Sequence, residues 1–394
     1  MIELEEANQR ILDVIHPTGE EIVALSEIDG RVLAEDLTAP INLPTFDNSA
    51  MDGYAVRAAE ALTGARLRRI GEAPAGTVFG GEVGEGQCVR IFTGSPMPAG
   101  ANAVVMQEDT RVEGETIEIT EGVKPLEHVR QRGEDVREGD VIGHAGELLG
   151  SSHLALLGSC GIGDVRVHRR PTIGLLATGN ELREAGAKLE PGEIFESNRQ
   201  TISRLVETSG AQSRIYPLVP DTLDDTVTAL KAAFTECDAV VTSGGVSVGE
   251  HDYVKAAFEK LGGTLDFWKV RMKPGKPFVC GRQEKRLLFG LPGNPVSAFV
   301  TFLLLVRPAL RKMSGATNTQ LPTHPAVLTA PLVNNGNRRN FMRVFVDAKG
   351  RAHPAGMQAS HALGSLAKAN ALVDVPPEST LEEKATVSVL RWAL

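Results

Sequence analysis

The sequence predicts a multidomain α/β protein organised around a central three-layer αβα domain with a doubly wound sheet. Between about residues 171 and 312, buried strands alternate with apolar-periodic helices, which is typical of crossover units on a mainly parallel sheet. Short β-like runs separated by glycine and proline dominate the residues before and after this part. The length of 394 residues also exceeds what one hydrophobic core usually spans.

Three regions are therefore expected along the chain. The middle one is the αβα domain, the first is β-rich with helical parts at both of its ends, and the last is a small β-barrel-like domain. The expected boundaries are 1–170 for the N-terminal region (helical within 1–28 and about 140–170, β-rich over about 29–139), 171–312 for the αβα domain and 320–394 for the C-terminal β domain.

The N-terminal region is expected to open with a helix over residues 3–15. Leu4, Ala7 and Ile11 recur at helical spacing, and His16-Pro17 ends that pattern. β-like runs follow, then a second apolar helix, and Pro171 marks the boundary to the next domain. The β-like runs are 67–70, 87–93, 103–107 and 116–120, and the second helix is 151–163.

In the αβα domain the expected elements alternate in type, and the C-terminal domain reads as strands with one short helix. The expected αβα strands are 172–177, 213–218, 239–242, 265–270 and 287–289, and the expected αβα helices are 198–208, 224–234, 253–261 and 296–310. For the C-terminal domain the expected strands are 326–332, 341–346, 371–375 and 386–390, and the short helix is 361–368.

Polar loops follow the strands of the αβα domain. Ligands in such sheets bind beyond the carboxyl ends of the strands, so these loops are expected to converge on one edge. Convergence would bring three carboxylates together with three lysines. The loops are 178–181, 220–222, 243–252, 269–277 and 291–295, the carboxylates are Glu181, Asp221 and Asp252, and the lysines are Lys269, Lys273 and Lys276.

Two of these loops have the chemistry of an anion site. Backbone N–H groups in a glycine turn before a helix favour a phosphate or oxyanion, and the 243–252 loop supplies Ser243, Gly244, Gly245 and Ser247. In the 269–277 loop, two prolines restrict the backbone that carries the lysines, and they are expected to forbid regular structure there. A purely structural turn stays open for both, because glycine turns without ligands and surface lysines are common.

The carboxylates predict Mg²⁺, which prefers oxygen ligands and bridges to substrate phosphates. Asp221 and Asp252 are the expected residues near the metal. Capping roles are the alternatives: Asp252 fits a helix N-cap, and Thr222 with Asp225 fits a capping box. Asn294 is likewise expected to cap the last helix of the domain, with a proline at its first position.

Composition excludes several function classes. A net charge of −9 argues against broad nucleic-acid binding and indicates a small anion as the partner of the local lysine cluster. The four cysteines have no C-x-x-C spacing, which argues against a disulfide framework or zinc site. With no basic and apolar leader and no apolar run approaching the length of a membrane span, we expect a cytoplasmic, soluble protein without membrane contact.

Six segments, in order along nearly the whole chain, resemble the MoeA family of molybdopterin molybdenumtransferases, to which the E domain of gephyrin is related. They include Asn48-Ser49-Ala50-Met51-Asp52-Gly53-Tyr54-Ala55, Thr93-Gly94-Ser95-Pro96-Met97-Pro98 and Thr178-Gly179-Asn180-Glu181-Leu182. The others are Ser243-Gly244-Gly245-Val246-Ser247-Val248-Gly249, Lys273-Pro274-Gly275-Lys276-Pro277 and Leu291-Pro292-Gly293-Asn294-Pro295-Val296-Ser297.

This resemblance implies a Mg²⁺-dependent enzyme that inserts molybdate into adenylylated molybdopterin and releases AMP, with an αβα domain of the molybdenum cofactor biosynthesis type. It also implies roles for Asp52, Thr93, Asp135 and Ser365, which lie outside the five loops. The implied catalytic residues are Asp252, Lys273, Lys276, Lys269, Glu181 and Asp221. The implied substrate-binding residues are Asp52, Thr93, Asp135, Ser243, Gly244, Gly245, Ser247, Pro292, Gly293, Asn294, Pro295 and Ser365.

The resemblance further implies a homodimer whose cleft combines two subunits, so that Asp52 and Thr93 act in trans, and a transient contact with the upstream molybdopterin adenylyltransferase. Two residues depart from the family pattern: Glu196 stands where an Asp often lies, and Thr222 stands where a second Asp often follows Asp221. Two other functions compete with this interpretation. One is the upstream adenylyltransferase, which is similar to the αβα domain alone, and the other is a gephyrin-like scaffold.

Overall fold

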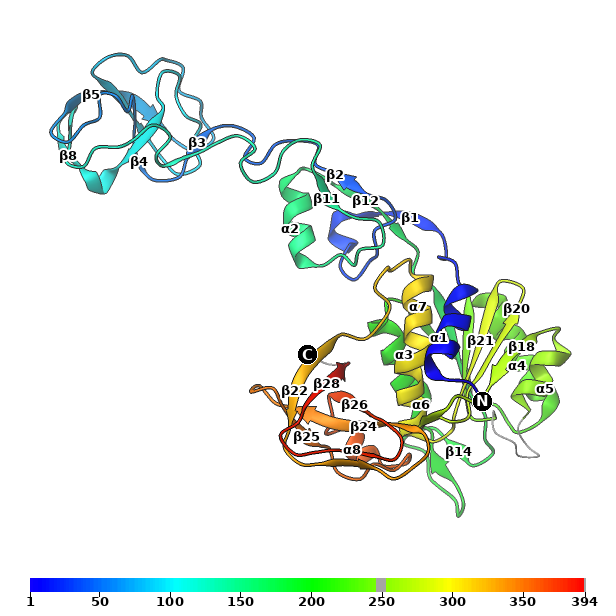
Figure 1. The fold of residues 1–394 in the computed structure, drawn as a ribbon. Helices are drawn as coiled ribbons and strands as arrows, with labels where there is room; N and C mark the ends of the chain where they lie inside the picture. The colour runs from blue at the N-terminus through cyan, green and yellow to red at the C-terminus, as the bar shows by residue number, and fades with distance from the viewer. Residues whose placement is uncertain (246–252, 393–394) are drawn as a thin grey trace.

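The computed structural model describes residues 1–245 and 253–392. The αβα domain and the C-terminal domain lie side by side, and the N-terminal region extends from them as an arm with a β-rich body at its far end (Figure 1). Within the described residues, no helix is both long and apolar enough to span a lipid bilayer.

The central sheet of the αβα domain has six strands in the order β16-β13-β17-β21-β20-β18. The first four strands are mutually parallel, as the sequence predicts, whereas β20 is antiparallel to both of its neighbours. The strands are β16 (Gln212–Ile215), β13 (Thr172–Ala177), β17 (Ala239–Ser243), β21 (Arg286–Leu291), β20 (Val279–Gln283) and β18 (Thr264–Trp268).

The sequence reasoning missed β20. This strand forms a hairpin with β21 through Glu284-Lys285, which lacks the Asn-Gly or Asp-Gly pair that usually signals such a turn. Glu284 instead adopts a left-handed φ of 54°. The hairpin is nevertheless well anchored, because Cys280 and Phe289 pair across it and both are buried.

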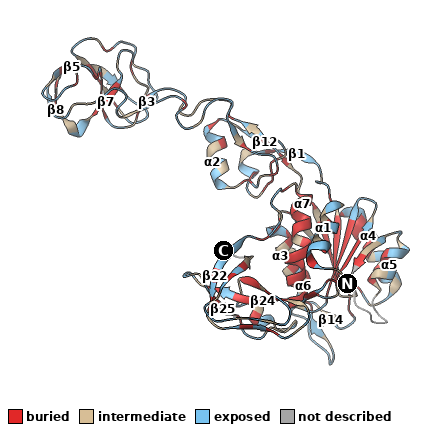
Figure 2. Cartoon of the chain, in the orientation of Figure 1, coloured by how far each residue is buried: buried red, intermediate tan, exposed pale blue. Residues whose placement is uncertain are grey.

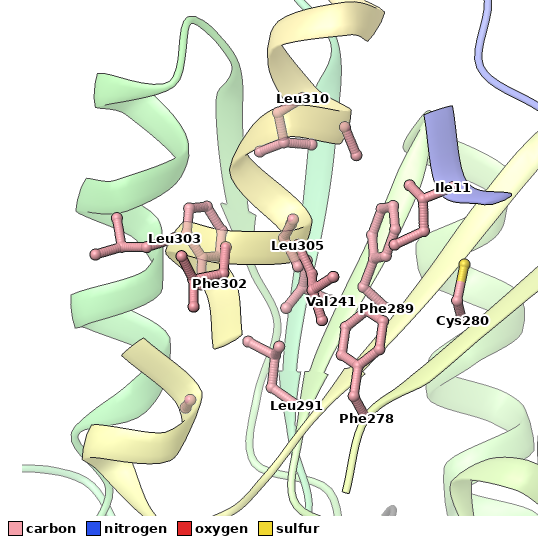
Figure 3. Close-up of a cluster of buried hydrophobic side chains, with 14 of the residues drawn as sticks. Ile11, Val241, Phe278, Cys280, Phe289, Leu291, Phe302, Leu303, Leu305 and Leu310 are labelled. Atoms are coloured by element: carbon pink, nitrogen blue, oxygen red, sulfur yellow. The ribbon is translucent and has the colours of Figure 1, made fainter. Parts of the chain in front are cut away.

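Helices cover both faces of the sheet and create two cores. Alternate residues of each strand point to opposite faces, so Leu175 lies in one core and Leu176 in the other. Figure 3 shows the larger core, in which Phe289 of the sheet faces Ile11 and Leu305 of the helices. The helices on that face are α1 (Leu4–Asp13), α3 (Asn198–Thr208), α6 (Pro295–Thr301) and α7 (Arg307–Met313), and those on the other face are α4 (Leu223–Glu236) and α5 (Val254–Lys260).

The helix expected over 296–310 is one continuous run with a change in its middle. Between α6 and α7, the segment η3 (Phe302–Val306) has π-helical geometry. Pro308 explains the change, because it has no N–H to donate to the carbonyl of Leu304 and its ring crowds that carbonyl. All five residues of η3 are buried, so packing stabilises the irregular turn.

The C-terminal domain is a closed five-stranded barrel, because β24 and β26, the first and last strands of the order β24-β25-β22-β28-β26, also pair with each other. The prediction of a small β-barrel-like domain is confirmed. Its strands are β24 (Arg339–Val346), β25 (Arg351–Pro354), β22 (Thr323–Leu328), β28 (Thr386–Arg391) and β26 (Ala371–Val375), accompanied by β23 (Leu332–Asn334), β27 (Ser379–Leu381) and α8 (Leu363–Leu366).

The lysine loop contributes an unexpected strand to this barrel. Its β19 (Met272–Lys273) pairs in parallel with β24, with Lys273 opposite Asn340. The expectation that the two prolines forbid regular structure was therefore wrong. Both prolines follow the paired residues, so the backbone of β19 keeps its hydrogen-bonding groups.

The N-terminal region has two bodies. The one nearer the αβα domain has α2 over a small core of residues such as Leu33 and Val167, and the far one is built on a six-stranded sheet. The near body contains β1 (Glu20–Ala24), η1 (Leu25–Glu27), β2 (Leu37–Thr38), β11 (Val141–Gly143), α2 (Ser151–Ser159) and β12 (Asp164–His168). The far body contains β3 (Asn48–Ser49), β4 (Gly53–Val56), β5 (Arg66–Ala73), β6 (Gln87–Ile91), β7 (Ala103–Met106), η2 (Gln107–Asp109), β8 (Thr110–Glu113), β9 (Thr116–Ile119) and β10 (Val129–Arg130).

The distribution of buried residues differs between the αβα domain and the arm. Buried residues are concentrated in the central sheet and in the helices packed on it, whereas the arm has smaller buried clusters and more exposed surface (Figure 2). Although α1 precedes the arm in sequence, it packs against α7 and η3, and its Leu4, Ala7 and Ile11 belong to the larger αβα core. The αβα domain is thus completed by the first residues of the chain.

Candidate active site

The predicted loops leave the central sheet at one edge. Ala177, Ser243 and Leu291 end three neighbouring strands, and the strand register places them side by side. The end of β18 lies at the same edge, because Trp268 pairs with Val279, which pairs with Gly290. We call this the loop edge, and it consists of the described residues of the five loops 178–181, 220–222, 243–245, 269–277 and 291–295.

Asn198, at the first position of α3, ties two of these loops together. Its Nδ2 donates to Ser243 Oγ at 2.7 Å and to the Gly293 carbonyl at 2.7 Å. The Gly244 N–H also donates to the Leu291 carbonyl at 3.2 Å. The sequence reasoning did not select Asn198 as a site residue, although Asn198 starts a predicted helix and follows Glu196-Ser197 in a segment that resembles the family pattern.

The glycine loop lies against the first loop. Gly244 and Gly245 have φ values of 89° and 66°, a conformation that suits glycine. A Cβ at Gly244 would be 2.8 Å from the Thr178 carbonyl oxygen, and one at Gly245 would be 2.7 Å from Val254. Glycine is therefore required here for close approach as well as for φ. Ser247 and Asp252, the other selected residues of this loop, lie outside the described residues.

The first two loops are joined by a reciprocal pair of hydrogen bonds. The Asn180 N–H donates to Asp221 Oδ2, and the Asp221 N–H donates to Asn180 Oδ1, both at 3.1 Å. Glu181 folds back toward Gly179, since its Oε2 would lie 2.6 Å from a Cβ at that glycine. The carboxylates of Glu181 and Asp221 thus belong to neighbouring loops. Beyond Glu181, β14 (Leu182–Arg183) and β15 (Ile194–Phe195) form a small parallel pair.

The lysine loop closes one side of the loop edge. Lys273 and Lys276 are exposed, and the Lys269 backbone has a left-handed φ of 83° with its N–H donating to the Phe278 carbonyl. Gly275 has a φ of 101°, and a Cβ there would be 2.2 Å from Thr301 Oγ1 at the end of α6. The side chains of Lys273 and Lys276 therefore extend from a loop that is packed onto α6.

The fifth loop starts α6. Pro292 is buried, Gly293 and Asn294 are exposed, and Pro295 occupies the first turn of the helix. Asn294 is the N-cap residue by position, as predicted, but its side chain makes no capping hydrogen bond.

The C-terminal barrel adds residues beside this edge. The Val296 N–H donates to the Ser360 carbonyl at 3.2 Å, so the segment before α8 lies next to the start of α6. Ser365 is buried, and its Oγ accepts from Arg343 Nε at 3.1 Å and donates to the Ala362 carbonyl. Ser365 therefore orients a cation that the sequence reasoning had missed.

Arg343 is fully buried without a carboxylate partner among the described residues. Its Nη2 donates to the Met357 and Ala359 carbonyls, whereas Nη1 is buried with no hydrogen-bond partner. Burial lowers the pKa of this guanidinium. A buried cation with an unused donor is a candidate anion ligand.

Two of the remaining selected residues lie together in the far body of the arm. Asp52 Oδ1 accepts from the Thr93 N–H at 2.8 Å and from the Thr93 hydroxyl at 2.9 Å. These bonds, the backbone bond first, lower the pKa of the Asp52 carboxyl. Asp135 is exposed and lines a cavity in the arm near α2. Figure 1 shows that the far body lies well away from the loop edge of the same chain.

Comparisons with known proteins cover the whole chain. Models of the MoeA N-terminal region (domain I and II), a probable molybdopterin binding domain and the MoeA C-terminal region (domain IV) match residues 2–161, 174–312 and 325–392. A molybdopterin molybdenumtransferase from Haemophilus influenzae is 40% identical over 385 residues, which cover 96% of this chain and 95% of the relative.

The chain belongs to the MoeA family.

Other MoeA family relatives agree. A molybdopterin molybdenumtransferase 2 from Mycobacterium tuberculosis is 36% identical, and the alignment covers 100% of both chains. The crystal structure of a molybdopterin biosynthesis MoeA protein from Pyrococcus horikoshii has a TM-score of 0.87 at 33% identity, with 100% of both chains covered. The family and fold predicted from the sequence are confirmed, and the chain is a transferase of molybdenum cofactor biosynthesis.

Family membership also decides against one competing interpretation. An enzyme that is similar to the αβα domain alone would leave the N- and C-terminal regions without a match, whereas MoeA models cover both of them. The chain therefore resembles the MoeA family as a whole and not only through its central domain.

The two departures from the MoeA pattern have structural explanations. Glu196 is buried, its Oε1 accepts from the N–H groups of Asn198 and Arg199, and its Oε2 accepts from Arg199 Nε. It thus stabilises the start of α3 and, through it, Asn198. Thr222 caps α4, with its Oγ1 accepting from the Asp225 N–H, so the predicted capping role of Thr222 is confirmed. The reciprocal bond of a capping box is not formed, because the Thr222 N–H donates to the Pro220 carbonyl.

Proposed function

We propose that this protein transfers molybdenum from molybdate into adenylylated molybdopterin in a Mg²⁺-dependent reaction that cleaves the phosphoanhydride and releases AMP. One observation carries the proposal. Loops that follow five strands meet the start of α3 at a single edge, where exposed lysines and carboxylates lie beside a glycine loop. A substrate with a pyrophosphate linkage needs this combination of groups.

The lysines and the glycine loop hold the phosphates in this proposal. Lys273 and Lys276 are exposed on a loop whose backbone is fixed against α6 and β24, so little side-chain and loop ordering remains for binding. Asn198 keeps the glycine loop and the 291–295 loop at a constant separation. Both features position a charged substrate and stabilise negative charge that develops on the leaving phosphate.

The carboxylates fit Mg²⁺ of the kind that is bridged to a substrate. No group of three or more His, Cys, Asp or Glu side chains that would cage a metal exists within residues 1–245 and 253–392. Mg²⁺ usually takes only one or two protein carboxylates and completes its shell with water and phosphate oxygens. Asp221, with Asp252 as the second carboxylate selected from the sequence, would supply such ligands, and the ion would neutralise phosphate charge.

Arg343 supports a place for molybdate. A fully buried guanidinium with one unused donor is costly unless an anion approaches it, and Ser365 fixes its orientation. The segment 356–362 that surrounds it lies next to α6 at the loop edge. A tetrahedral dianion held there would be adjacent to the bound phosphates, as the reaction requires.

A homodimer would explain the position of Asp52 and Thr93. Both belong to the far body of the arm, which lies well away from the loop edge of its own chain (Figure 1). A two-fold symmetric dimer would bring the arm of one subunit to the edge of the other. In this arrangement the carboxylate of Asp52, oriented by Thr93, completes the site in trans.

The activity test uses purified protein, adenylyl-molybdopterin, Mg²⁺ and molybdate, and measures AMP by chromatography. We expect AMP release that depends on both the metal and molybdate. Lys273→Ala should lower the rate at least about tenfold, which corresponds to about 1.4 kcal/mol of transition-state stabilisation. AMP release that proceeds equally well without molybdate would reject the proposal.

The trans arrangement is tested by mixing two inactive subunits. Asp52→Ala and Lys273→Ala subunits, co-expressed with different tags, should give mixed dimers in which one of the two sites carries neither substitution. A random mixture should then recover about a quarter of wild-type activity. If Asp52 and Lys273 of one chain instead formed a single site, every site would carry one of the two substitutions. The mixture would then be no more active than the two separate variants.

A further inference from the structure

A second group of cations lies on α7, away from the loop edge. Arg307 and Arg311 are four residues apart, hence on the same face of the helix, and both line a cavity of about 560 Å³. Residues 144–148 of the arm and residues 317–322 close the cavity. Arg307 follows Pro295 by twelve residues, which places it roughly 18 Å along the helix from the loop edge.

Neither arginine has a carboxylate partner in the described part of the chain. Arg311 is only 7% exposed, and its Nε is buried without a hydrogen-bond partner. Arg307 Nη1 donates to the Thr319 carbonyl at 2.8 Å. By contrast, the buried Arg199 is compensated, because its guanidinium pairs with both Glu184 and Glu196.

The electrostatics of the cavity agree with an uncompensated positive charge. Burial lowers the pKa of Arg311, and burial together with the charge of Arg311 lowers the pKa of Arg307 to about 10. One carboxylate, that of Glu147, also lines the cavity, but its Oε1 lies 3.1 Å from His153 and its Oε2 accepts from the His144 N–H. Glu147 therefore has its own partners.

A third arginine extends the cationic surface. Arg391 Nε is buried without a hydrogen-bond partner, and Arg391 lines an adjoining cavity of about 180 Å³ that also includes Arg307. Three guanidinium groups from the αβα domain and the barrel thus line two cavities that share Arg307 and Pro322. Burying such charges is unfavourable unless an anion offsets it.

We propose that Arg307 and Arg311 form a binding site for a small phosphate-type oxyanion, free or carried on a larger molecule. Guanidinium groups match the geometry of phosphate oxygens and form strong charge-assisted hydrogen bonds with them. The site is separate from the loop edge and does not depend on the proposed function. Because it lies where α7, the arm and the barrel meet, an anion bound there would hold the three parts together.

The test measures binding of inorganic phosphate and of glycerol 3-phosphate by calorimetry and thermal unfolding at constant ionic strength. Near saturation we expect the melting temperature of the wild-type protein to rise by about 2 °C or more. Arg311→Met and Arg307→Met should each bind at least about tenfold more weakly. Arg204→Met removes the same charge from an exposed position on α3 and should keep the full response.

The two probes distinguish a free oxyanion from an esterified one. The probe that binds the wild-type protein more tightly indicates which form the site takes, and either result supports the site. If Arg311→Met does not fold, the test relies on Arg307→Met, which is at a partly exposed position and should likewise bind at least about tenfold more weakly. The proposal is overturned if neither probe binds the wild-type protein, or if both probes bind the foldable arginine variants as tightly as they bind the wild type.

Discussion

Replacing Glu196 by alanine should cost the αβα domain much of its stability. The side chains of Glu196 and Arg199 are each only 3% exposed, and they form a hydrogen-bonded ion pair. The substitution also removes the acceptor for two N–H groups at the start of α3. Breaking a buried pair by removing one partner typically costs about 3–5 kcal/mol. At roughly 2–4 °C per kcal/mol, the transition of this domain should fall by at least about 6 °C.

Glu184 provides a matched control, because it pairs with the same arginine from an exposed position. Arg199 Nη2 lies 2.6 Å from Glu184, whose side chain is 64% exposed. Glu184→Ala should therefore cost no more than about 1 kcal/mol. Differential scanning calorimetry measures the loss of stability in both variants and shows whether the buried partner costs more than the exposed one. Equal losses, or a loss below about 1 kcal/mol for Glu196→Ala, would show that burial does not set the strength of this pair.

Two further predictions concern the lysine loop and the far body of the arm. Gly275→Ala should lower activity at least about tenfold, because its Cβ would be 2.2 Å from Thr301 Oγ1. The control Gly262→Ala, also at a left-handed φ but with no atom within 4 Å, should lower activity less than about twofold. Equal rates for the two variants would show that activity does not depend on the position of the lysine loop. The pKa of Asp52 is lowered by Thr93, so its ionised form stabilises the far body above the unfolded pKa of about 3.9, and that stabilisation is lost as the pH falls through the lowered folded pKa. Carboxyl NMR titration should give a pKa below that of an ordinary Asp, and Thr93→Ala should raise it only in part because the backbone N–H remains; an unchanged pKa would exclude the hydroxyl as a cause.

The alternation of strands and helices determined most of the αβα fold. Thr172–Ala177 and Asn198–Thr208 have the predicted limits, because the first is a continuous, mostly apolar run and the apolar residues of the second recur at helical spacing. Both signals lie within the element itself and need no distant contact to be recognised. The convergence of the loops was also predictable, since parallel strands share one carboxyl edge. The strand β20 was not, because its turn has no local signal.

Contacts between distant segments were decided only by the tertiary structure. The pairing of β19 with β24, the link from Asn198 to two loops and the bond between Arg343 and Ser365 join residues that are far apart in sequence. The two arginines of α7, which have no carboxylate partner among the described residues, were equally invisible, because a sequence shows an arginine but not which groups surround it. Local periodicity is written in neighbouring residues, whereas charge compensation and burial depend on which segments the fold brings together.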